Sequence, residues 1–436
     1  MQKILILLVF GLTIFFAVSN QTTEEQTKLV VQSVVTDGVG EKAGILPGDI
    51  LLKYNGAALN TLKQLNEIKA EVKTESVEIV IVRDDKEISF EIPKGPIGVY
   101  LKELLPDLKY KNDAVVIKDI PKLDWATGKM NSFLACVELV ANHMGIQKDY
   151  TWLDGISGAA FRLHFCQGWC PSSPDPTCGY NSGEAALKAL GLQYKVMHLS
   201  SDGKNRPEIK KAIKASINKK IPVIAIDLID VAEWGLVTGY QDNGEELICR
   251  TFFDKRNSYD IAQKFPWALY IITGKKAMAK ETDLYKQSYK TVLANLTTEN
   301  YDQYFSGINA FDKWIEHLQK TDFAKMDSAQ LDNAIMANSW IFDRLISDRA
   351  DAAAYLESIA PKFPVFSSQL TDLANIYREE SKMLEETEVN IPNSNIVKSS
   401  NEWTPAMRQD EVTLLQQAKT KEESALKIWQ EIVKEK

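Results

Sequence analysis

The fold of the first part of the chain is decided by residues 41–51, which read EKAGILPGDIL. Pro47 fixes the φ angle at the first corner of a turn, and Gly48 can adopt the positive φ that the second corner requires. Apolar residues then alternate with others from Ile50 to Tyr54, which is the period of a half-buried strand. This stretch therefore predicts a tight turn that leads directly into a strand.

Patterns on both sides of this turn predict a small β-rich unit. Asn55-Gly56 is a strong hairpin-turn sequence. Helical spacing of apolar residues follows at 62–72. Val-rich or alternating runs predict strands at 29–35, 77–82 and 88–92.

The string at 41–51 and this order of elements resemble the PDZ domains of bacterial envelope proteases. The resemblance implies a PDZ domain over residues 24–101 that binds peptide or protein C-termini. In those domains the carboxylate-binding loop precedes the Ala-Gly-Ile element, whereas the best candidate here comes last, which implies a permuted strand order. The expected peptide-binding residues are Gly95, Pro96, Ile97, Gly98 and Val99. Alternatively, the two glycines only turn the chain out of the domain.

Length and composition indicate a folded, multidomain protein. At 436 residues the chain is long enough for two to four domains. Its hydrophobic content of 45% and charged content of 25% are ordinary for globular proteins. The formal net charge is −8, with no long Lys/Arg block, so we expect no nucleic-acid partner.

The N-terminus has the layout of a secretory signal peptide. Lys3 provides a positive end, residues 4–18 form an apolar run, and Ala17 and Ser19 are small residues at the positions that a signal peptidase reads. We expect a signal peptide at 1–19, export to the periplasm or beyond the cell, and no membrane span after cleavage. An uncleaved membrane anchor is the alternative.

A mixture of helix and strand patterns over 115–276 predicts an α+β domain. A helix starting at Asn131 or Ser132 and ending at Gly145 carries Cys136 one turn in. A helix N-terminus stabilises a thiolate, which is the reactive form of cysteine. Cys136 is therefore a candidate nucleophile, although buried, inert helical cysteines are also common.

Residues 131–145 and the segment 234–240, which reads WGLVTGY, resemble papain-like cysteine peptidases that trim bacteriocin leader peptides. Residues 150–163 resemble a sister group that includes the acyltransferase of butirosin biosynthesis. The resemblance implies a papain-like domain with its catalytic His directly before Trp234. This chain has Glu233 at that position, which could also be a solvated loop carboxylate.

The absence of that His leaves few catalytic candidates. His164 is the replacement base that the sequence offers, and Asp254 could orient a base if one exists. The candidate catalytic residues are therefore Cys136, Glu233, Asp254 and His164.

Three further cysteines, Cys166, Cys170 and Cys178, lie in a Pro-rich segment next to His164. Their spacing matches no familiar zinc-finger pattern, and an exported chain permits disulfides. We expect one disulfide among these three cysteines, with metal binding as the alternative. We expect no metal site and no cofactor.

The remainder, 280–436, has almost wholly helical patterns and predicts an all-α bundle, interrupted by a polar linker at 390–400. Its charged residues, such as Arg344, Asp348 and Arg349, are expected on a solvated or salt-bridged face.

Two functions follow from these patterns. The first is an exported peptide-binding protein with a PDZ domain and a papain-like domain that lacks the usual catalytic His. The alternative is a thiol peptidase or acyltransferase that uses Cys136 on substrates recruited by the PDZ domain.

Overall fold

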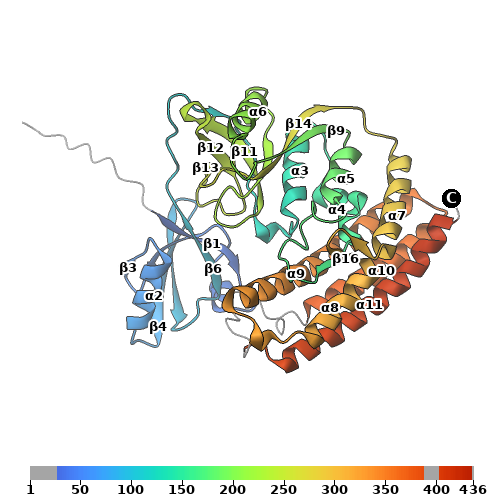
Figure 1. Cartoon of the computed structure of the whole chain (residues 1–436). Coiled ribbons are helices and arrows are strands. Elements are labelled where there is room, and N and C mark those ends of the chain that lie inside the picture. Colours follow the sequence, from blue (N-terminus) through green and yellow to red (C-terminus); the bar gives the residue numbers. More distant parts are fainter. Residues whose placement is uncertain (1–26, 387–401, 435–436) are drawn as a thin grey trace, which may run out of the picture. The chain divides into compact units, whose positions relative to one another are not determined.

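The computed structural model describes residues 27–386 and 402–434. Its internal contacts divide the chain into two compact units, with the division between Pro106 and Asp107 (Figure 1). The expected signal peptide at 1–19 and the linker at 390–400 lie outside the described residues.

The N-terminal unit is an antiparallel sheet with two helices. Its strand order is β5-β4-β2-β1-β6, and β3 pairs with β2. The strands are β1 (Lys28–Val34), β2 (Ile50–Tyr54), β3 (Ala57–Ala58), β4 (Ser76–Arg83), β5 (Lys86–Pro93) and β6 (Val99–Leu104); the helices are α1 (Val39–Ala43) and α2 (Leu62–Glu71).

Local sequence explains most of these elements. Asn55 and Gly56 both have positive φ (51° and 78°), as a two-residue hairpin turn between β2 and β3 requires. Helix α2 begins with a capping box, in which the Thr61 side chain accepts from the Gln64 amide and the Gln64 side chain reaches back. The helix and the strands expected at 29–35, 50–54, 77–82 and 88–92 are confirmed.

Strand β6 extends the N-terminal unit beyond its expected end at residue 101. It pairs antiparallel with β1, from Val34 opposite Val99 to Lys28 opposite Leu104. Because β6 is the last strand in the sheet order, it is an edge strand. The expected boundary was therefore three residues short.

The second unit is built around a sheet of order β13-β12-β11-β10-β14-β9, with β7 pairing with β11. These strands are β7 (Val115–Val116), β9 (Leu192–His198), β10 (Val223–Ile226), β11 (Trp234–Gln241), β12 (Glu246–Arg250), β13 (Asp260–Ile261) and β14 (Ala268–Lys275). Helix α3 (Ser132–His143) contacts β10 and β11, α5 (Ser182–Ala189) contacts β9, and α6 (Arg206–Asn218) contacts β10, β11 and β14. Every residue of β10 and β11 is buried, as in strands covered on both faces.

Further helices pack against this α+β part (Figure 1). They are α4 (Tyr150–Ser157), α7 (Glu281–Thr297), α8 (Gly307–Lys320), α9 (Ser328–Ile359), α10 (Ser367–Glu385) and α11 (Pro405–Lys434). Helices α4 and α9 approach so closely that a Cβ on Gly155 would lie 2.0 Å from the Tyr355 ring. Trp429 belongs to the same hydrophobic core as the sheet. The expected domains 115–276 and 280–436 therefore belong to one compact unit.

The C-terminal part was expected to be all-α, but it also contains two short strands. Strands β15 (Asn300–Tyr301) and β16 (Tyr304–Ser306) form a hairpin, and β16 pairs with β8 (His164–Cys166). This small sheet joins the cysteine-containing segment to the helical part.

Three charged residues of the expected solvated or salt-bridged face are buried, and for them the salt-bridged alternative is correct. Arg344, Asp348 and Arg349 are 8%, 5% and 0% exposed. Helix α9 is covered by α4 and α10, so charges along it are enclosed and must find partners inside the protein. Arg344 pairs with Asp348 at 2.5 Å, and Arg349 donates to the Ala160 carbonyl at 2.8 Å.

Candidate functional site

The candidate peptide-binding loop, residues 95–99, connects β5 to β6. Gly95 and Gly98 have φ values of 134° and 74°, a region that residues with a Cβ rarely adopt. The Gly98 carbonyl accepts from the Val35 amide at 2.9 Å, which holds the loop against the end of β1. The Ile97 side chain is 4% exposed and anchors the loop in the core.

Two backbone amides in this loop are unused. Within the described residues, the N–H groups of Ile97 and Gly98 donate no hydrogen bond. Consecutive free N–H groups form a concave site for an anion. These two donors make the loop a candidate site for a carboxylate.

An open strand edge and a helix continue from this loop. Strand β6 follows it directly and has no partner on its outer edge within the described sheet. Helix α2 lies beside β6, because the Leu62 amide donates to Glu103 Oε1 at 2.8 Å. Tyr100 and Leu62 are 65% and 37% exposed, so this region offers apolar surface beside the unpaired edge.

Cys136 lies in the core, and within the described residues no histidine pairs with it. Asn131 caps α3 by accepting from the Leu134 amide at 3.1 Å, as expected. Cys136 is 0% exposed, and its burial, with a smaller effect of Glu233, raises the thiol pKa well above its ordinary value. The expectation of a lowered pKa is therefore wrong, because desolvation outweighs the helix dipole at this depth.

The other expected catalytic residues have their own partners. The His164 ring accepts at Nδ1 from Arg162 Nε at 2.9 Å. Burial and the neighbouring Arg162 lower the pKa of His164 well below its ordinary value, so it is neutral. Asp254 pairs with Arg250 and accepts from the Thr251 amide at 2.8 Å. None of the contacts of the described residues brings His164 or Asp254 to Cys136.

Glu233 instead meets Ser132, a residue that sequence reasoning considered only as a helix cap. The Ser132 hydroxyl donates to Glu233 Oε2 at 2.6 Å. Burial is the main cause that raises the pKa of Glu233. Asn131-Ser132 was visible in the sequence as a helix start, but nothing in the sequence pairs Ser132 with a residue just before β11.

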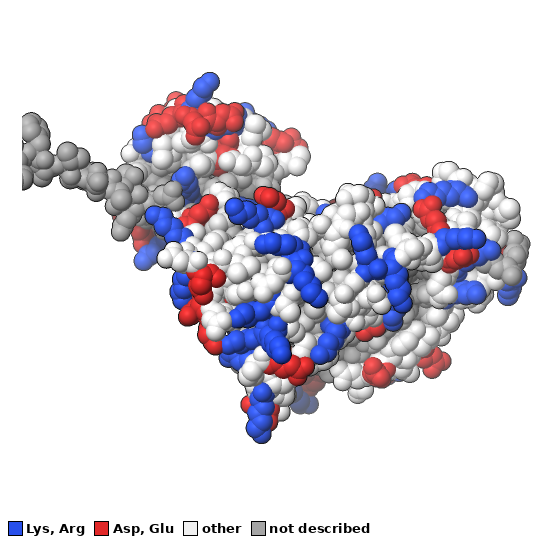
Figure 2. Space-filling view, turned by 90° about the horizontal axis from the view of Figure 1, so that it is seen from above, with Lys and Arg blue, Asp and Glu red and all other residues white. Residues whose placement is uncertain are grey.

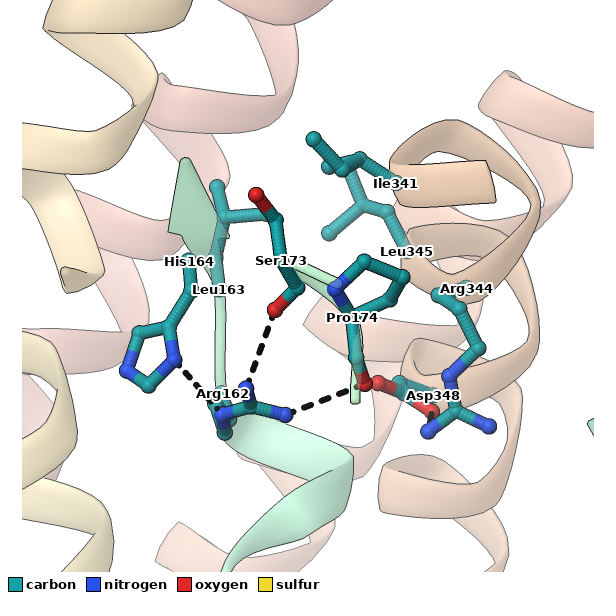
Figure 3. Close-up of a pocket in the computed structure, with 9 residues that line it drawn as sticks. All are labelled: Arg162, Leu163, His164, Ser173, Pro174, Ile341, Arg344, Leu345 and Asp348. Atoms are coloured by element: carbon teal, nitrogen blue, oxygen red, sulfur yellow. Dashed lines mark hydrogen bonds and ion pairs between the residues drawn. The ribbon is translucent and has the colours of Figure 1, made fainter. Parts of the chain in front are cut away.

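Figure 3 shows a small polar cavity near His164. Arg162, His164, Ser173, Pro174, Arg344 and Asp348 are among the residues that line it. The space is about what a single water molecule needs.

Arg162 is the centre of this cluster. Its guanidinium donates to the carbonyls of Ser173 at 3.0 Å, Asp175 at 2.7 Å and Cys178 at 3.0 Å. These bonds hold the Pro-rich segment that contains the cysteines against Arg162.

None of the five cysteines is in a disulfide. The sulfur of Cys170 lies 2.8 Å from the Ser172 hydroxyl, and Cys178 also hydrogen-bonds to Ser172 and to Tyr304. Within the described residues, no group of three or more His, Cys, Asp or Glu could hold a metal ion. The expected disulfide therefore stays a prediction.

Basic side chains are frequent on one face of the protein (Figure 2), although the net charge of the chain is negative. Lys and Arg side chains gather over much of the face seen in Figure 2. Around α6 some of them have acidic partners, such as Lys204 with Asp202 at 2.9 Å. The expected absence of a nucleic-acid partner stays a prediction. In the described ranges, no helix combines the length and the apolar character needed to cross a membrane.

Comparison with known proteins identifies one part of the chain. Residues 30–83 match the PDZ domain family. This match covers β1 to β4 and ends before the loop at 95–99. No curated protein matches the chain. The comparisons give no support for the papain-like resemblance of the second unit.

Proposed function

We propose that this protein is an exported peptide-binding protein whose PDZ domain captures the free C-termini of peptides or proteins. The observation that carries the proposal is the pair of unused amides at Ile97 and Gly98, placed directly before an open edge strand. A terminal carboxylate would accept from both amides. The rest of the peptide would pair with β6 as an added strand beside α2.

The second unit, in this proposal, is a papain-like domain in which Cys136 has no catalytic role. An antiparallel sheet with a cysteine-bearing helix against β10 and β11 is compatible with this fold. The burial of Cys136 and the Glu at position 233 speak against the alternative of a thiol peptidase or acyltransferase.

Peptide binding is tested by comparing acid and amide forms of one peptide with an apolar C-terminal residue. Fluorescence anisotropy on the full chain should show about 10- to 100-fold weaker binding of the amide, because charge-assisted hydrogen bonds contribute about 1.5–3 kcal/mol. Equal affinity for the two forms would exclude the loop as a carboxylate site.

A matched pair of variants separates the loop from general stability. Gly98→Ala places a Cβ at a φ of 74° and 3.1 Å from the Val39 amide nitrogen, so it should distort the loop and weaken binding. Gly56→Ala has a similar φ of 78° but faces open space in the β2–β3 turn. It should cost similar stability and leave the affinity unchanged.

A further inference from the structure

We propose that Ser132 and Glu233 form a nucleophile–base pair, and that the second unit accepts acyl groups on the Ser132 hydroxyl. The hydroxyl donates to the carboxylate at 2.6 Å, the distance at which a base can remove a proton. Ser132 is the first residue of α3, and Glu233 directly precedes β11. The inference is independent of peptide binding by the N-terminal unit.

A second helix of the same unit shows that this pairing is not a by-product of helix capping. Helix α5 also starts with Asn-Ser, at Asn181 and Ser182, and Asn181 caps it in the same way as Asn131 caps α3. In the described part of the chain, however, the Ser182 hydroxyl donates to the Pro176 carbonyl at 3.4 Å and to no carboxylate. The carboxylate partner is therefore specific to α3.

The two capping asparagines differ as well. Asn181 Nδ2 donates to the Tyr270 hydroxyl at 3.3 Å. Asn131 is 2% exposed, yet its Nδ2 has no partner, while its Oδ1 caps the start of α3. A buried amide without a partner is costly unless something binds it. This unsatisfied donor lies at the same helix end as Ser132.

The start of α3 also provides backbone donors for a developing oxyanion. Within the described residues, the N–H groups of Ser132 and Phe133 donate no hydrogen bond. With Asn131 Nδ2 they are three donors at the start of α3 for which the described residues provide no acceptor. Donors fixed in this way stabilise the negative charge of a tetrahedral intermediate.

Glu233 is oriented as a base should be. The Trp234 amide donates to its carboxylate, and the Trp234 ring donates to Asp175 Oδ2 at 2.8 Å. Burial raises the pKa of Glu233, which makes its ionised form a stronger base.

The surroundings indicate the class of substrate. At this end of the sheet, β10 ends at Ile226 opposite Trp234, where β11 begins. Beside them, β9 ends at His198 opposite Ala268, where β14 begins. The loops there carry Val231 and Trp267, both 44% exposed. These apolar side chains, in the same loops as the ion pair of Lys264 with Asp227 at 2.8 Å, suit an ester or amide with an apolar acyl group.

The reaction is an ordinary acyl transfer. The Ser132 oxygen bonds to the acyl carbon, the bond from that carbon to the alcohol or amine breaks, and the Ser132 proton passes through Glu233 to the leaving group. Water or a second alcohol or amine then removes the acyl group from Ser132 and restores its proton.

A fluorophosphonate probe tests the pair on the full chain. The Ser132 oxygen would bond to phosphorus, fluoride would leave, and the proton would go to Glu233. Mass spectrometry should find the label on the peptide that contains Ser132. Ser132→Ala should abolish it, and Glu233→Gln should slow labelling about 100-fold or more, as loss of a general base does.

Matched variants control for folding. Ser182→Ala removes the equivalent hydroxyl at the start of α5 and should label at the rate of the unchanged protein. Ser132→Cys keeps the shape of the site and should react with iodoacetamide at that position. Labelling that survives Ser132→Ala, or no labelling of unchanged protein with native circular dichroism, overturns the proposal. Either failure leaves the acid-versus-amide peptide comparison unaffected.

Discussion

Arg349 of α9 and Glu422 of α11 are both fully buried and are joined by a hydrogen bond of 2.5 Å from Arg349 Nε. Glu380 of α10 lies 3.7 Å from the same guanidinium. One cation thus holds two carboxylates between three helices that are distant in sequence. Burial disfavours the charged forms of all three groups, so each depends on the others.

Replacing Arg349 with Met should therefore destabilise the second unit strongly. The change leaves Glu380 and Glu422 buried without their cation, which typically costs about 3–5 kcal/mol. Urea unfolding followed by circular dichroism measures it. Arg378→Met is the matched control, because Arg378 pairs with Glu357 on the surface, where a pair contributes about 0–1 kcal/mol. Equal effects of the two variants would show that the buried network is not needed.

The stability of the protein should depend on pH through Glu411. This side chain is 0% exposed, and its burial raises its pKa from 4.5 to about 8. The folded chain therefore binds the proton more tightly than the unfolded chain, so stability is highest below pH ~4.5 and falls as pH rises to about 8. The full difference is about 5 kcal/mol.

Glu411→Gln should remove this part of the pH dependence. Other buried carboxylates, such as Asp154, are present in both proteins, so the difference between the two unfolding curves isolates Glu411. Chemical unfolding at pH 5, 6, 7 and 8 should give converging values at low pH and a more stable variant at high pH. Parallel curves would contradict the assignment.

The rate of alkylation should distinguish the buried cysteines from the half-buried ones. Cys136 and Cys249 are both 0% exposed with pKa values raised by burial, so iodoacetamide at neutral pH should leave them unmodified in the native state. The half-buried Cys166, Cys170 and Cys178 should label first. Peptide mapping with and without denaturant checks this order. Rapid native labelling of Cys136 would revive the thiol-enzyme alternative.

A disulfide, if the protein is exposed to an oxidant, should join Cys170 to Cys178. Both sulfurs contact the one Ser172 hydroxyl, so little movement would bring them together. Treatment with oxidised glutathione and mapping of non-reduced peptides should find this link. The link should persist in Cys166→Ser and disappear in Cys178→Ser, and a link through Cys166 would refute the pairing.

The end of the PDZ domain can be tested by truncation. A fragment of residues 27–106 retains Lys102, Glu103 and Leu104, which pair with the start of β1. A fragment ending at 101 loses these ladder bonds and should be less stable by about 1–3 kcal/mol, at roughly 0.5–1.5 kcal/mol per hydrogen bond. Thermal unfolding of both fragments measures the difference. A third fragment, 27–109, should match the one ending at 106.

Features that depend on neighbouring residues could be predicted from the sequence. The turn at Gly48, the hairpin at Asn55-Gly56 and the cap of α3 by Asn131 all appear where the sequence placed them. Each is decided by the backbone preferences of one or two residues, or by a hydrogen bond over three positions. The PDZ domain, recognised from such a string, is the part that comparison with known proteins confirms.

The candidate sites of the second unit could not be predicted in this way. Ser132 and Glu233 are 101 positions apart, and neither has a local reason to pair with the other. Cys136 has the helix position of a reactive thiol, but the sheet beneath α3 desolvates it and reverses the expected shift in pKa.

The sequence by itself therefore determined the local elements and the character of the first domain, because turns and caps are made by groups that the chain already holds together. Only the tertiary structure decided which polar groups lose water. Arg349 lies in the region where the sequence predicted helices, and it is a buried cation because other helices enclose it. Arg162 is likewise a buried cation, because the carbonyls of residues 173–178 accept hydrogen bonds from its guanidinium. The cost of burying a charge depends on what packs around it, and that is settled only when distant segments meet.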